Sequence, residues 1–244
     1  MKFFIGIFNV RHAAEFDACC ISVNTLEGRK SDFAVKDWIL DSGAFSKLSR
    51  DGGYKQSVSS YAQKIKRWGS NGNLLAAVTE DYMCEPQMLA RTGLTVEKHQ
   101  QLTMERYCEL LTFGCNVPIL PVLQGYLPQD YVQHIEMYGP LLEKGMWVGV
   151  GSVCKRNRDV FSIEDVLSTI NRKRPDLRLH GFGVKKTALT SEYVQKTLYS
   201  ADSMAWSFQA RRDGRDANSC ETAKQWLADF NSREIKPALV PTLL

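Results

Sequence analysis

Short apolar segments recur along the whole chain and predict a sheet built mainly of buried strands. Each segment is four to seven residues long, which is the usual length of a strand, and most are rich in Val, Ile, Leu or aromatic residues. The segments are 3–8, 18–23, 37–40, 74–78, 118–123, 146–151, 177–183 and 198–204.

Helical patterns lie between the later segments. Apolar residues recur there at spacings of three and four, most clearly over 54–68, which is typical of a helix with one buried face. A hydroxyl followed by two acidic residues predicts a helix that begins at Ser162. The other expected helices are 95–113 with Thr95 as N-cap, 129–143 after Pro128, 189–197 and 217–230.

Eight strands, most of them followed by a helix, predict an α/β fold. We expect one domain over residues 1–244, a (β/α)8 TIM barrel. An open doubly wound sheet is the alternative, and the lack of a Gly-x-Gly-x-x-Gly sequence after the first strand weakens it. No linker, low-complexity stretch or internal repeat divides the chain.

Composition is that of an ordinary globular protein, with 24% charged and 44% hydrophobic residues. No apolar run reaches the roughly 18 residues of a membrane helix. The apolar opening ends at Asn9 and Arg11, too early for a secretory signal, so we expect a cytoplasmic protein without a membrane partner. Seven scattered cysteines without a Cys-x-x-Cys pair indicate neither a disulfide framework nor a zinc ribbon.

The net charge of +4 is unevenly distributed. Residues 1–149 carry 15 basic and 16 acidic side chains, whereas residues 150–244 carry 16 basic and 11 acidic ones. These basic residues are either solvated loops and helix ends or a surface that binds phosphates. The basic clusters are Lys155-Arg156-Asn157-Arg158, Arg172-Lys173-Arg174, Lys185-Lys186 and Arg211-Arg212-x-x-Arg215.

Carboxylates follow three of the expected strands. Asp41 ends the third strand, Glu80 and Asp81 follow the fourth, and Asp202 lies in the last. Residues at the carboxyl ends of barrel strands gather at one mouth. Adjacent acids point to opposite sides of a strand, so we expect one of Glu80 and Asp81 to face that mouth. Two facing carboxylates can divide acid–base and nucleophilic roles, as glycosyl transfer requires.

Neutral groups follow other strands. Gln124 ends a strongly apolar run and can both donate and accept hydrogen bonds, which suits a nucleobase or a carbohydrate. Glycines in the segment Gly149-Val150-Gly151, and at Gly181, let a ligand approach the backbone or let strands pack closely. His180 fits a structural role equally well, and the sequence assigns it no function.

Taken in order, these motifs resemble the tRNA-guanine transglycosylase superfamily. The resemblance extends from about Asn24 to Trp226 and is strongest to the DNA-directed branch. That branch is the DNA-guanine transglycosylases (DpdA), which insert 7-deazaguanines into DNA, including phage DNA. The matching motifs are Asp41-Ser42-Gly43-Ala44-Phe45, Glu80-Asp81-x-x-Cys84-x-Pro86, Gln124-Gly125, Gly149-Val150-Gly151 and Asp202-Ser203.

The resemblance implies a role for each motif. Asp202 is the nucleophile that attacks the sugar, and Asp41 is the general acid–base. Asp81 and Gln124 bind the Watson–Crick edge of the base. The resemblance, together with the strand-end positions, gives the remaining expected substrate-binding residues as Ser42, Gly43, Phe45, Gly149, Val150, Gly151 and Gly181. The resemblance favours a nucleic-acid-binding surface for the basic residues of 150–244. The expected contacts are Lys155, Arg156, Lys185, Arg211, Arg212 and Arg215.

Three departures from the tRNA enzymes shape the prediction. Their Cys-x-Cys-x-x-Cys…His zinc element is missing, because only Cys220 and no histidine follows Asp202. Ala44 replaces the second glycine of the turn, and 204–207 replaces a Pro-Thr-Arg stretch. We therefore expect no metal and no cofactor.

The resulting expectation is a DNA-guanine transglycosylase that exchanges guanine in DNA for a free base such as preQ0. The protein would act in the host cytoplasm if a phage encodes it. A tRNA-guanine transglycosylase is the first alternative, and a non-catalytic nucleic-acid-binding partner subunit is the second. The sequence leaves open the particular 7-deazaguanine, the oligomeric state, including a homodimer, and any helper proteins.

Overall fold

A parallel sheet forms the centre of the molecule. The structure is a computed structural model, and it describes residues 1–153, 156 and 159–232. Within these residues there are nine strands, and every pairing between them is parallel. The strands are β1 (Lys2–Gly6), β2 (Ala18–Ser22), β3 (Asp37–Asp41), β4 (Asn73–Val78), β5 (Ile119–Leu120), β6 (Val122–Leu123), β7 (Trp147–Val150), β8 (Arg178–Gly181) and β9 (Leu198–Ser203).

The sheet curls into a nearly closed barrel. Its strand order is β5-β4-β3-β2-β1-β9-β8-β7-β6, and the two outermost strands are separated in the chain only by Pro121. Proline has no N–H and interrupts the ladder, although its carbonyl still accepts a hydrogen bond from the Gly149 N–H at 2.8 Å. The order contains no central reversal of the kind that marks a doubly wound sheet. The parallel barrel-like architecture is thus confirmed, with nine hydrogen-bonded strands in the described chain where eight were expected.

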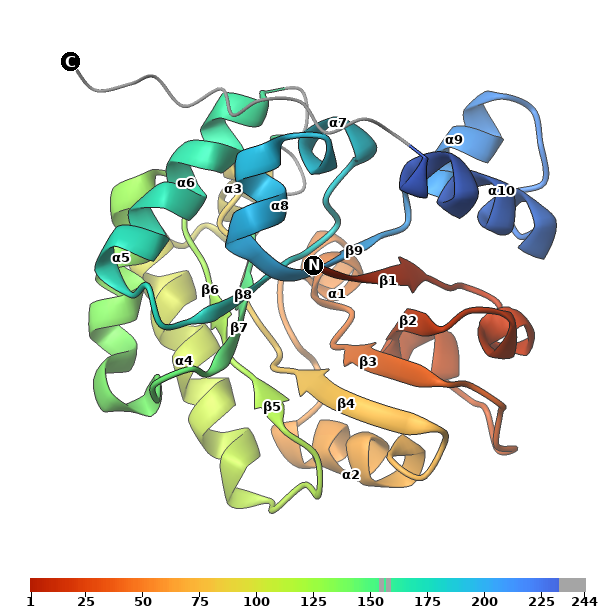
Figure 1. Ribbon diagram of the computed structural model, residues 1–244. Helices are drawn as coiled ribbons and strands as arrows, with labels where there is room; N and C mark the ends of the chain where they lie inside the picture. The colour runs from red at the N-terminus through yellow and green to blue at the C-terminus, as the bar shows by residue number, and fades with distance from the viewer. Residues whose placement is uncertain (154–155, 157–158, 233–244) are drawn as a thin grey trace.

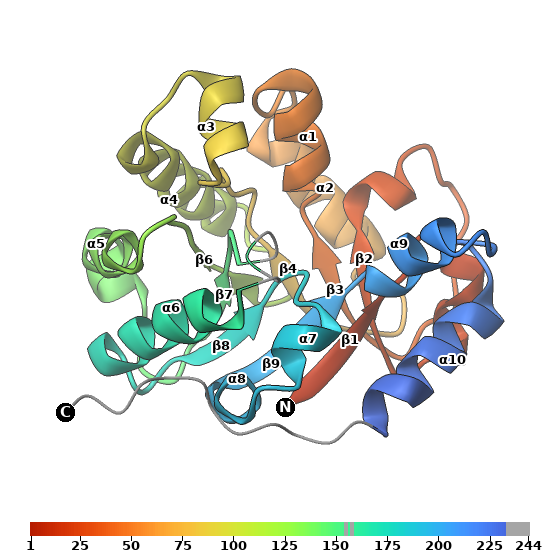
Figure 2. The same cartoon turned by 90° about the horizontal axis from the view of Figure 1, so that it is seen from above.

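Helices surround the sheet, as the view from above shows clearly (Figures 1 and 2). The α-helices are α1 (Ala44–Asp51), α2 (Val58–Trp68), α3 (Pro86–Thr92), α4 (Val96–Thr112), α5 (Pro128–Tyr138), α6 (Val160–Lys173), α7 (Lys186–Leu189), α8 (Glu192–Thr197), α9 (Ala205–Arg212) and α10 (Cys220–Asn231). Short 3-10 helices are η1 (Val10–Glu15), η2 (Val23–Leu26) and η3 (Gly139–Leu141).

Several helix boundaries differ from the sequence pattern: the helix expected over 54–68 begins at Val58, and the one expected over 189–197 is divided into α7 and α8. The helix expected to begin at Ser162 begins earlier, because Asp159 is its N-cap and accepts the Ser162 N–H at 3.1 Å. Aspartate caps as well as serine does, and it comes first in the chain. The helix expected over 129–143 ends at Tyr138, where Gly139 and Pro140 stop it. Thr95 is confirmed as an N-cap, since its hydroxyl accepts the Lys98 N–H.

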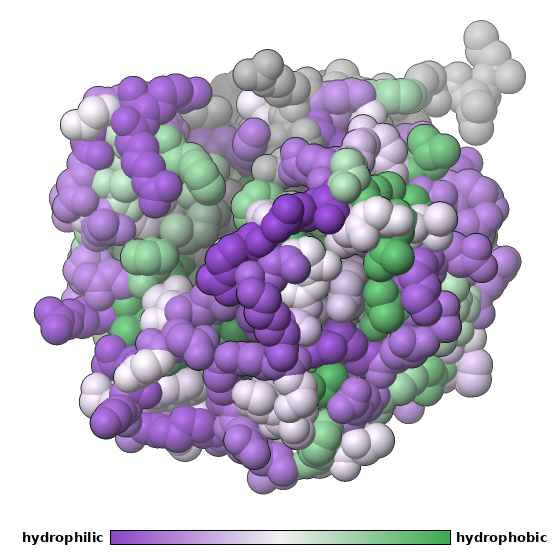
Figure 3. All heavy atoms as spheres, turned by 180° about the vertical axis from the view of Figure 1, so that it is seen from behind, coloured by the Kyte–Doolittle hydropathy of each residue, from purple (hydrophilic) through white to green (hydrophobic). Residues whose placement is uncertain are grey.

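The hydrophobic core lies in two layers. Inward-facing residues of six strands, β1 to β6, fill the inside of the barrel and form one cluster of Phe4, Cys20, Ile39, Ala76, Val78, Leu120 and Val122. Two larger clusters pack between the sheet and the helices. Hydrophobic areas on the face behind Figure 1 are interspersed with hydrophilic side chains (Figure 3). No helix among the described residues is long and apolar enough to cross a membrane.

Candidate active site

Asp202 lies near the end of β9 with its carboxylate held in a fixed orientation. Its Oδ1 accepts a hydrogen bond from the Gly183 N–H at 3.1 Å and lies 3.3 Å from His180 Nε2. Gly183 adopts a positive φ of 60°, a conformation that favours glycine and that carries the chain past Asp202. The Asp202 side chain remains 11% exposed, so a ligand in the barrel mouth can reach it.

Asp41 ends β3, and two strands, β2 and β1, lie between it and the β9 strand of Asp202. Burial, followed by the negative charge of Asp202, raises the pKa of Asp41 above its ordinary value. The Gly43 N–H donates to Asp41 Oδ2 at 2.9 Å. Cys20 on the intervening β2 has its pKa raised by burial and then by both carboxylates. Both carboxylates therefore lie close enough to Cys20 for their charges to act on it.

Asp81 is the centre of a buried hydrogen-bond network. Gln124 Nε2 donates to Asp81 Oδ2, and the Ser42 hydroxyl lies 3.4 Å from Asp81 Oδ1. The Ser152 hydroxyl donates to Gln124 Oε1 at 2.8 Å and accepts the Cys84 N–H at 2.9 Å. Each group thus fixes the next, and the amide of Gln124 turns its nitrogen toward Asp81. Burial, and then the charge of Asp41, raises the pKa of Asp81 to about 7.

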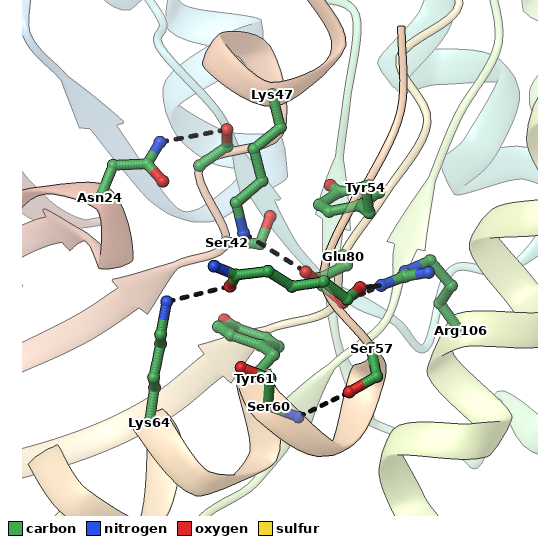
Figure 4. Close-up of polar contacts among 12 residues, drawn as sticks. Asn24, Ser42, Lys47, Tyr54, Ser57, Ser60, Tyr61, Lys64, Glu80 and Arg106 are labelled. Carbon is green, nitrogen blue, oxygen red and sulfur yellow. Dashed lines mark hydrogen bonds and ion pairs between the residues drawn. The ribbon is translucent and has the colours of Figure 1, made fainter. Parts of the chain in front are cut away.

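Glu80 points toward the positive charges of Lys47 and Arg106 (Figure 4). Its carboxylate is 1% exposed and contacts Lys47 Nζ from α1 at 3.3 Å and Arg106 from α4 at 2.5 Å. The ring of Tyr54 lies against both cations, 5.1 Å from Lys47 Nζ and 4.5 Å from the Arg106 guanidinium carbon. The two neighbouring acids therefore have different partners, and the ion pairs of Glu80 hold the segment that presents Asp81.

The expected glycine residues serve different purposes. A Cβ on Gly151 would lie 2.2 Å from Gln124 Nε2, and one on Gly149 would lie 2.3 Å from the Phe182 ring, so both glycines make room for groups of the site. Gly181 faces Val184 and Leu198, and Val150 lies in the cluster between sheet and helices. A side chain at either position therefore faces the packing between sheet and helices, and a backbone contact of Gly181 or Val150 with a base stays a prediction.

Gly43 and Phe45 begin α1 directly after Asp41. Gly43 has a φ of 73°, and a Cβ there would collide with the side chain of Asn24, which donates to the Gly43 carbonyl. This glycine produces the tight turn that separates Asp41 from the helix. Phe45 is 46% exposed in the first turn of α1.

The expected nucleic-acid contacts separate into two groups. Arg211, Arg212 and Arg215 are exposed at the end of α9 or just after it, the helix that follows Asp202, and Lys185 is exposed before α7. Arg156 instead joins two loops, because its guanidinium donates to the Ser152 and Tyr126 carbonyls and stacks 4.7 Å from the Tyr126 ring. Lys155 lies outside the described residues.

The segment that departs from the tRNA enzymes anchors α9 to β1. The Trp206 indole donates to the Gly6 carbonyl at 2.8 Å, and Met204 packs where a Cβ on Gly6 would lie. The donor set for the zinc of the tRNA enzymes is not available after Asp202. In the part of the chain that the structure describes, no three His, Cys, Asp or Glu side chains gather around a common metal position.

Sequence reasoning missed several residues of this site. His180 and Ser152 contact the expected functional residues directly, and Lys47 and Arg106 hold Glu80. His180 could have been found because it is a polar residue within a buried strand. Ser152 has a φ of 57°, rare for serine, and no sequence pattern reveals that conformation.

Fold and site together define an α/β barrel-like protein with acidic side chains gathered at the carboxyl ends of its parallel strands. Residues 25–240 match the family model DpdA, described as DeoxyPurine in DNA protein A. The chain belongs to this family, which supports a transglycosylase-type enzyme that modifies DNA. Comparison with curated proteins found no match.

Proposed function

We propose that this protein exchanges a guanine base in DNA for a free 7-deazaguanine base such as preQ0, through a covalent bond between Asp202 and the sugar. The proposed fold is a (β/α)8 barrel in which β5 and β6 are counted as one strand. The substrate guanine is turned out of the DNA stack into the barrel mouth, because C1′ is not accessible to in-line attack within a stacked duplex.

In the first half-reaction, a carboxylate oxygen of Asp202 donates an electron pair to C1′ of the nucleotide. The bond between C1′ and N9 breaks, and its electron pair leaves with the guanine. Asp41 transfers its proton to the departing base, which becomes neutral guanine. The raised pKa of Asp41 supports this role, because the carboxyl group carries a proton at a higher pH than an ordinary aspartate does.

In the second half-reaction, the free 7-deazaguanine enters and gives its N9 proton to Asp41. N9 then attacks C1′, and the ester bond to Asp202 breaks with the electron pair returning to the carboxylate. Each step inverts C1′, so the product retains the original configuration. The covalent intermediate predicts ping-pong kinetics.

In this proposal, Asp81 recognises the base. An ionised carboxylate can accept the N1–H and exocyclic amino hydrogens that guanine and 7-deazaguanine share. Gln124 orients Asp81 and retains a second N–H, and Ser42 supports the same carboxylate. Both bases therefore suit one pocket, as an exchange reaction requires.

One observation carries the proposal: in a chain of the DpdA family, two carboxylates at strand ends have different environments, and the charge of one acts on the other. Asp202 is held by two donors, while Asp41 is pushed toward its protonated form by burial and by Asp202. This division suits a nucleophile and an acid. It also argues against the non-catalytic partner subunit, which has no need of both groups. A phage-encoded enzyme of this kind would act on DNA in the host cytoplasm.

The test is mass spectrometry of nucleosides from DNA incubated with the protein and each candidate base. We expect a deoxynucleoside of the added 7-deazaguanine and a matching release of guanine. DNA incubated without free base should yield a denaturant-resistant protein–DNA adduct at Asp202. Neither a new nucleoside nor an adduct, with any base tested, would overturn the proposed function.

A further inference from the structure

We propose that His180 is a positioning residue that selects which oxygen of Asp202 attacks the sugar, through a hydrogen-bond chain that begins at Trp147. The proposal rests on the proposed function for its kinetic consequence, whereas the chain itself is a property of the folded protein. The links are Trp147 Nε1 to Ser200 Oγ at 2.8 Å, Ser200 Oγ to His180 Nδ1 at 2.9 Å and His180 Nε2 to Asp202 Oδ1 at 3.3 Å.

The direction of the hydrogen bonds follows from the chemistry of the first group. An indole N–H can only donate, so Ser200 Oγ must accept from Trp147. Ser200 is fully buried, and its single hydroxyl hydrogen finds an acceptor in His180 Nδ1. Nδ1 is then unprotonated, and neutral His180 carries its hydrogen on Nε2, where it donates to Asp202. The opposite tautomer would turn a lone pair of Nε2 toward a carboxylate.

Aromatic packing holds the imidazole in this orientation. Its ring centroid lies 4.6 Å from that of Phe182 and 6.0 Å from those of Phe4 and Trp147, and all three rings meet it edge to face. His180 is fully buried. The ring therefore has little freedom to turn, and its N–H stays directed at one point on Asp202.

The attacking oxygen of Asp202 is selected because both hydrogen-bond donors bind the other oxygen. His180 Nε2 and the Gly183 N–H both bind Asp202 Oδ1. Two hydrogen bonds stabilise negative charge on Oδ1 and fix the plane of the carboxylate. Oδ2 is then the oxygen whose electron pair forms the bond to C1′. When the ester forms, Oδ1 becomes its carbonyl oxygen and can keep both donors.

The kinetic test compares His180→Met, which removes the N–H, with His180→Gln, which can keep a donor near the position of Nε2. Adduct formation with DNA in the absence of free base isolates the attack by Asp202. We expect His180→Met to slow this step about 10- to 100-fold, as loss of a hydrogen bond to a charged group implies. His180→Gln should recover most of the rate, and the Kd for DNA and the KM for free base should stay unchanged in both variants.

A second pair of variants covers a His180→Met protein that does not fold. Ser200→Ala removes the group that sets the tautomer, and Ser200→Thr keeps the hydroxyl. Ser200→Ala should slow adduct formation, and Ser200→Thr should restore it. Equal adduct rates in wild type and in the folded donor-free variants would overturn the positioning role, as would a loss caused only by weaker DNA binding.

Nitrogen NMR of the histidine side chains separates this proposal from the proposed function. We expect the unliganded protein to show His180 as the neutral tautomer protonated at Nε2, and Ser200→Ala to weaken that preference. A His180 protonated at Nδ1 would overturn the hydrogen-bond chain even in an active enzyme. Nε2 protonation in a protein that forms no adduct would instead leave the chain standing and refute the transglycosylase reaction.

Discussion

The carboxyl groups of Asp41 and Asp202 are electrostatically coupled although their strands are not neighbours. Burial is the larger cause of the raised pKa of Asp41, and the charge of Asp202 adds to it. β2 and β1 lie between β3 and β9. Both carboxylates contribute, after burial, to the raised pKa of the inward-facing Cys20 on β2. Because the charge of Asp202 alters the protonation of Asp41, a substitution at Asp202 has consequences at both positions.

Asp202→Asn should abolish base exchange and leave DNA binding nearly intact, because the amide cannot form the glycosyl ester. It should also lower the pKa of Asp41, since a charge that raises this pKa is removed. Nucleoside mass spectrometry measures the first effect, and a carboxyl NMR titration measures the second. Asp229→Asn, at an exposed position of α10, is the matched control and should behave as wild type. Turnover retained by Asp202→Asn would remove the nucleophile assignment.

Asp41→Asn should slow adduct formation by more than about 100-fold, the usual contribution of a general acid. In the wild type, the acid form of Asp41 is required, so the rate of the first half-reaction should fall as the pH rises through the raised pKa. The variant should lack this limb of the pH profile. Single-turnover adduct formation across a pH series measures both effects. Near-normal adduct formation by the variant at neutral pH would exclude Asp41 from the mechanism.

Asp81 should make the stability of the protein depend on pH. Its pKa rises from 3.8 to about 7 on folding, so the folded state retains the proton that the unfolded state loses. The wild type should therefore lose stability relative to Asp81→Asn as the pH increases from about 4 to about 7, by no more than about 4 kcal/mol. Urea unfolding of both proteins across this range measures the difference, and a constant difference would show that Asp81 titrates normally.

The same ionisation should control base binding in the opposite direction. Only the carboxylate form of Asp81 offers acceptors to both donors of the guanine edge, so the KM for free base should rise as the pH falls below about 7. Measuring exchange at limiting base, with saturating DNA, isolates this effect from the acid role of Asp41. A KM that is constant between pH 6 and pH 8 would contradict base recognition by Asp81.

Much of the architecture follows from local sequence patterns, because each apolar segment is long enough to define its own strand. The split of one segment at Pro121 into β5 and β6 is likewise a local effect. Boundaries set by competition between two good caps, such as Asp159 and Ser162, are less certain from sequence. Three short helices, α1, α3 and α9, were not expected at all, since none is long enough to show a clear repeat.

The site could be predicted only as far as strand ends reveal it. Asp41, Asp81, Gln124 and Asp202 each follow or end a strand, and the barrel brings strand ends together. The hydrogen bonds that orient them depend on pairings across the barrel, such as Ser152 with Gln124 over 28 positions of the chain. No local pattern encodes such a contact. Gly181 is expected in the site from its strand-end position alone, and its contact with a base stays a prediction, since a Cβ there would face Val184 and Leu198.

Arg211→Glu should weaken DNA binding more than changes at the neighbouring arginines do. Arg212 and Arg215 both lie near Asp213, at 3.7 and 3.0 Å, whereas the Arg211 guanidinium lies over the exposed ring of Phe208. A carboxylate between two arginines reduces their attraction for phosphate. Loss of one phosphate contact should reduce the slope of log K against log salt concentration by about 1. Fluorescence anisotropy with a DNA hairpin over a salt series measures the slope.

The control for Arg211 is Arg172→Glu, an exposed arginine in the last turn of α6. Helices of this architecture begin at the carboxyl edge of the sheet and end at the opposite edge, so Arg172 is far from the barrel mouth. It changes the net charge equally and should alter the salt slope little. Equal effects of both variants would show that binding follows net charge alone and not a defined contact at α9.

The polymer substrate should be DNA, and guanines that are mismatched or single-stranded should react faster than those in a stable duplex. The active-site carboxylates suit either polymer, so the choice rests on the family match, the missing zinc element and the 204–207 segment that fixes α9 against β1. RNA differs in its 2′-hydroxyl and in the shape of its helix. Turning a paired guanine out of a duplex costs a few kcal/mol, which an unpaired guanine does not require. Parallel incorporation of labelled base into single-stranded DNA, duplex DNA and bulk tRNA at matched salt measures the preference. Efficient labelling of tRNA with none in either DNA would reverse the choice of polymer and leave the base-exchange chemistry in place.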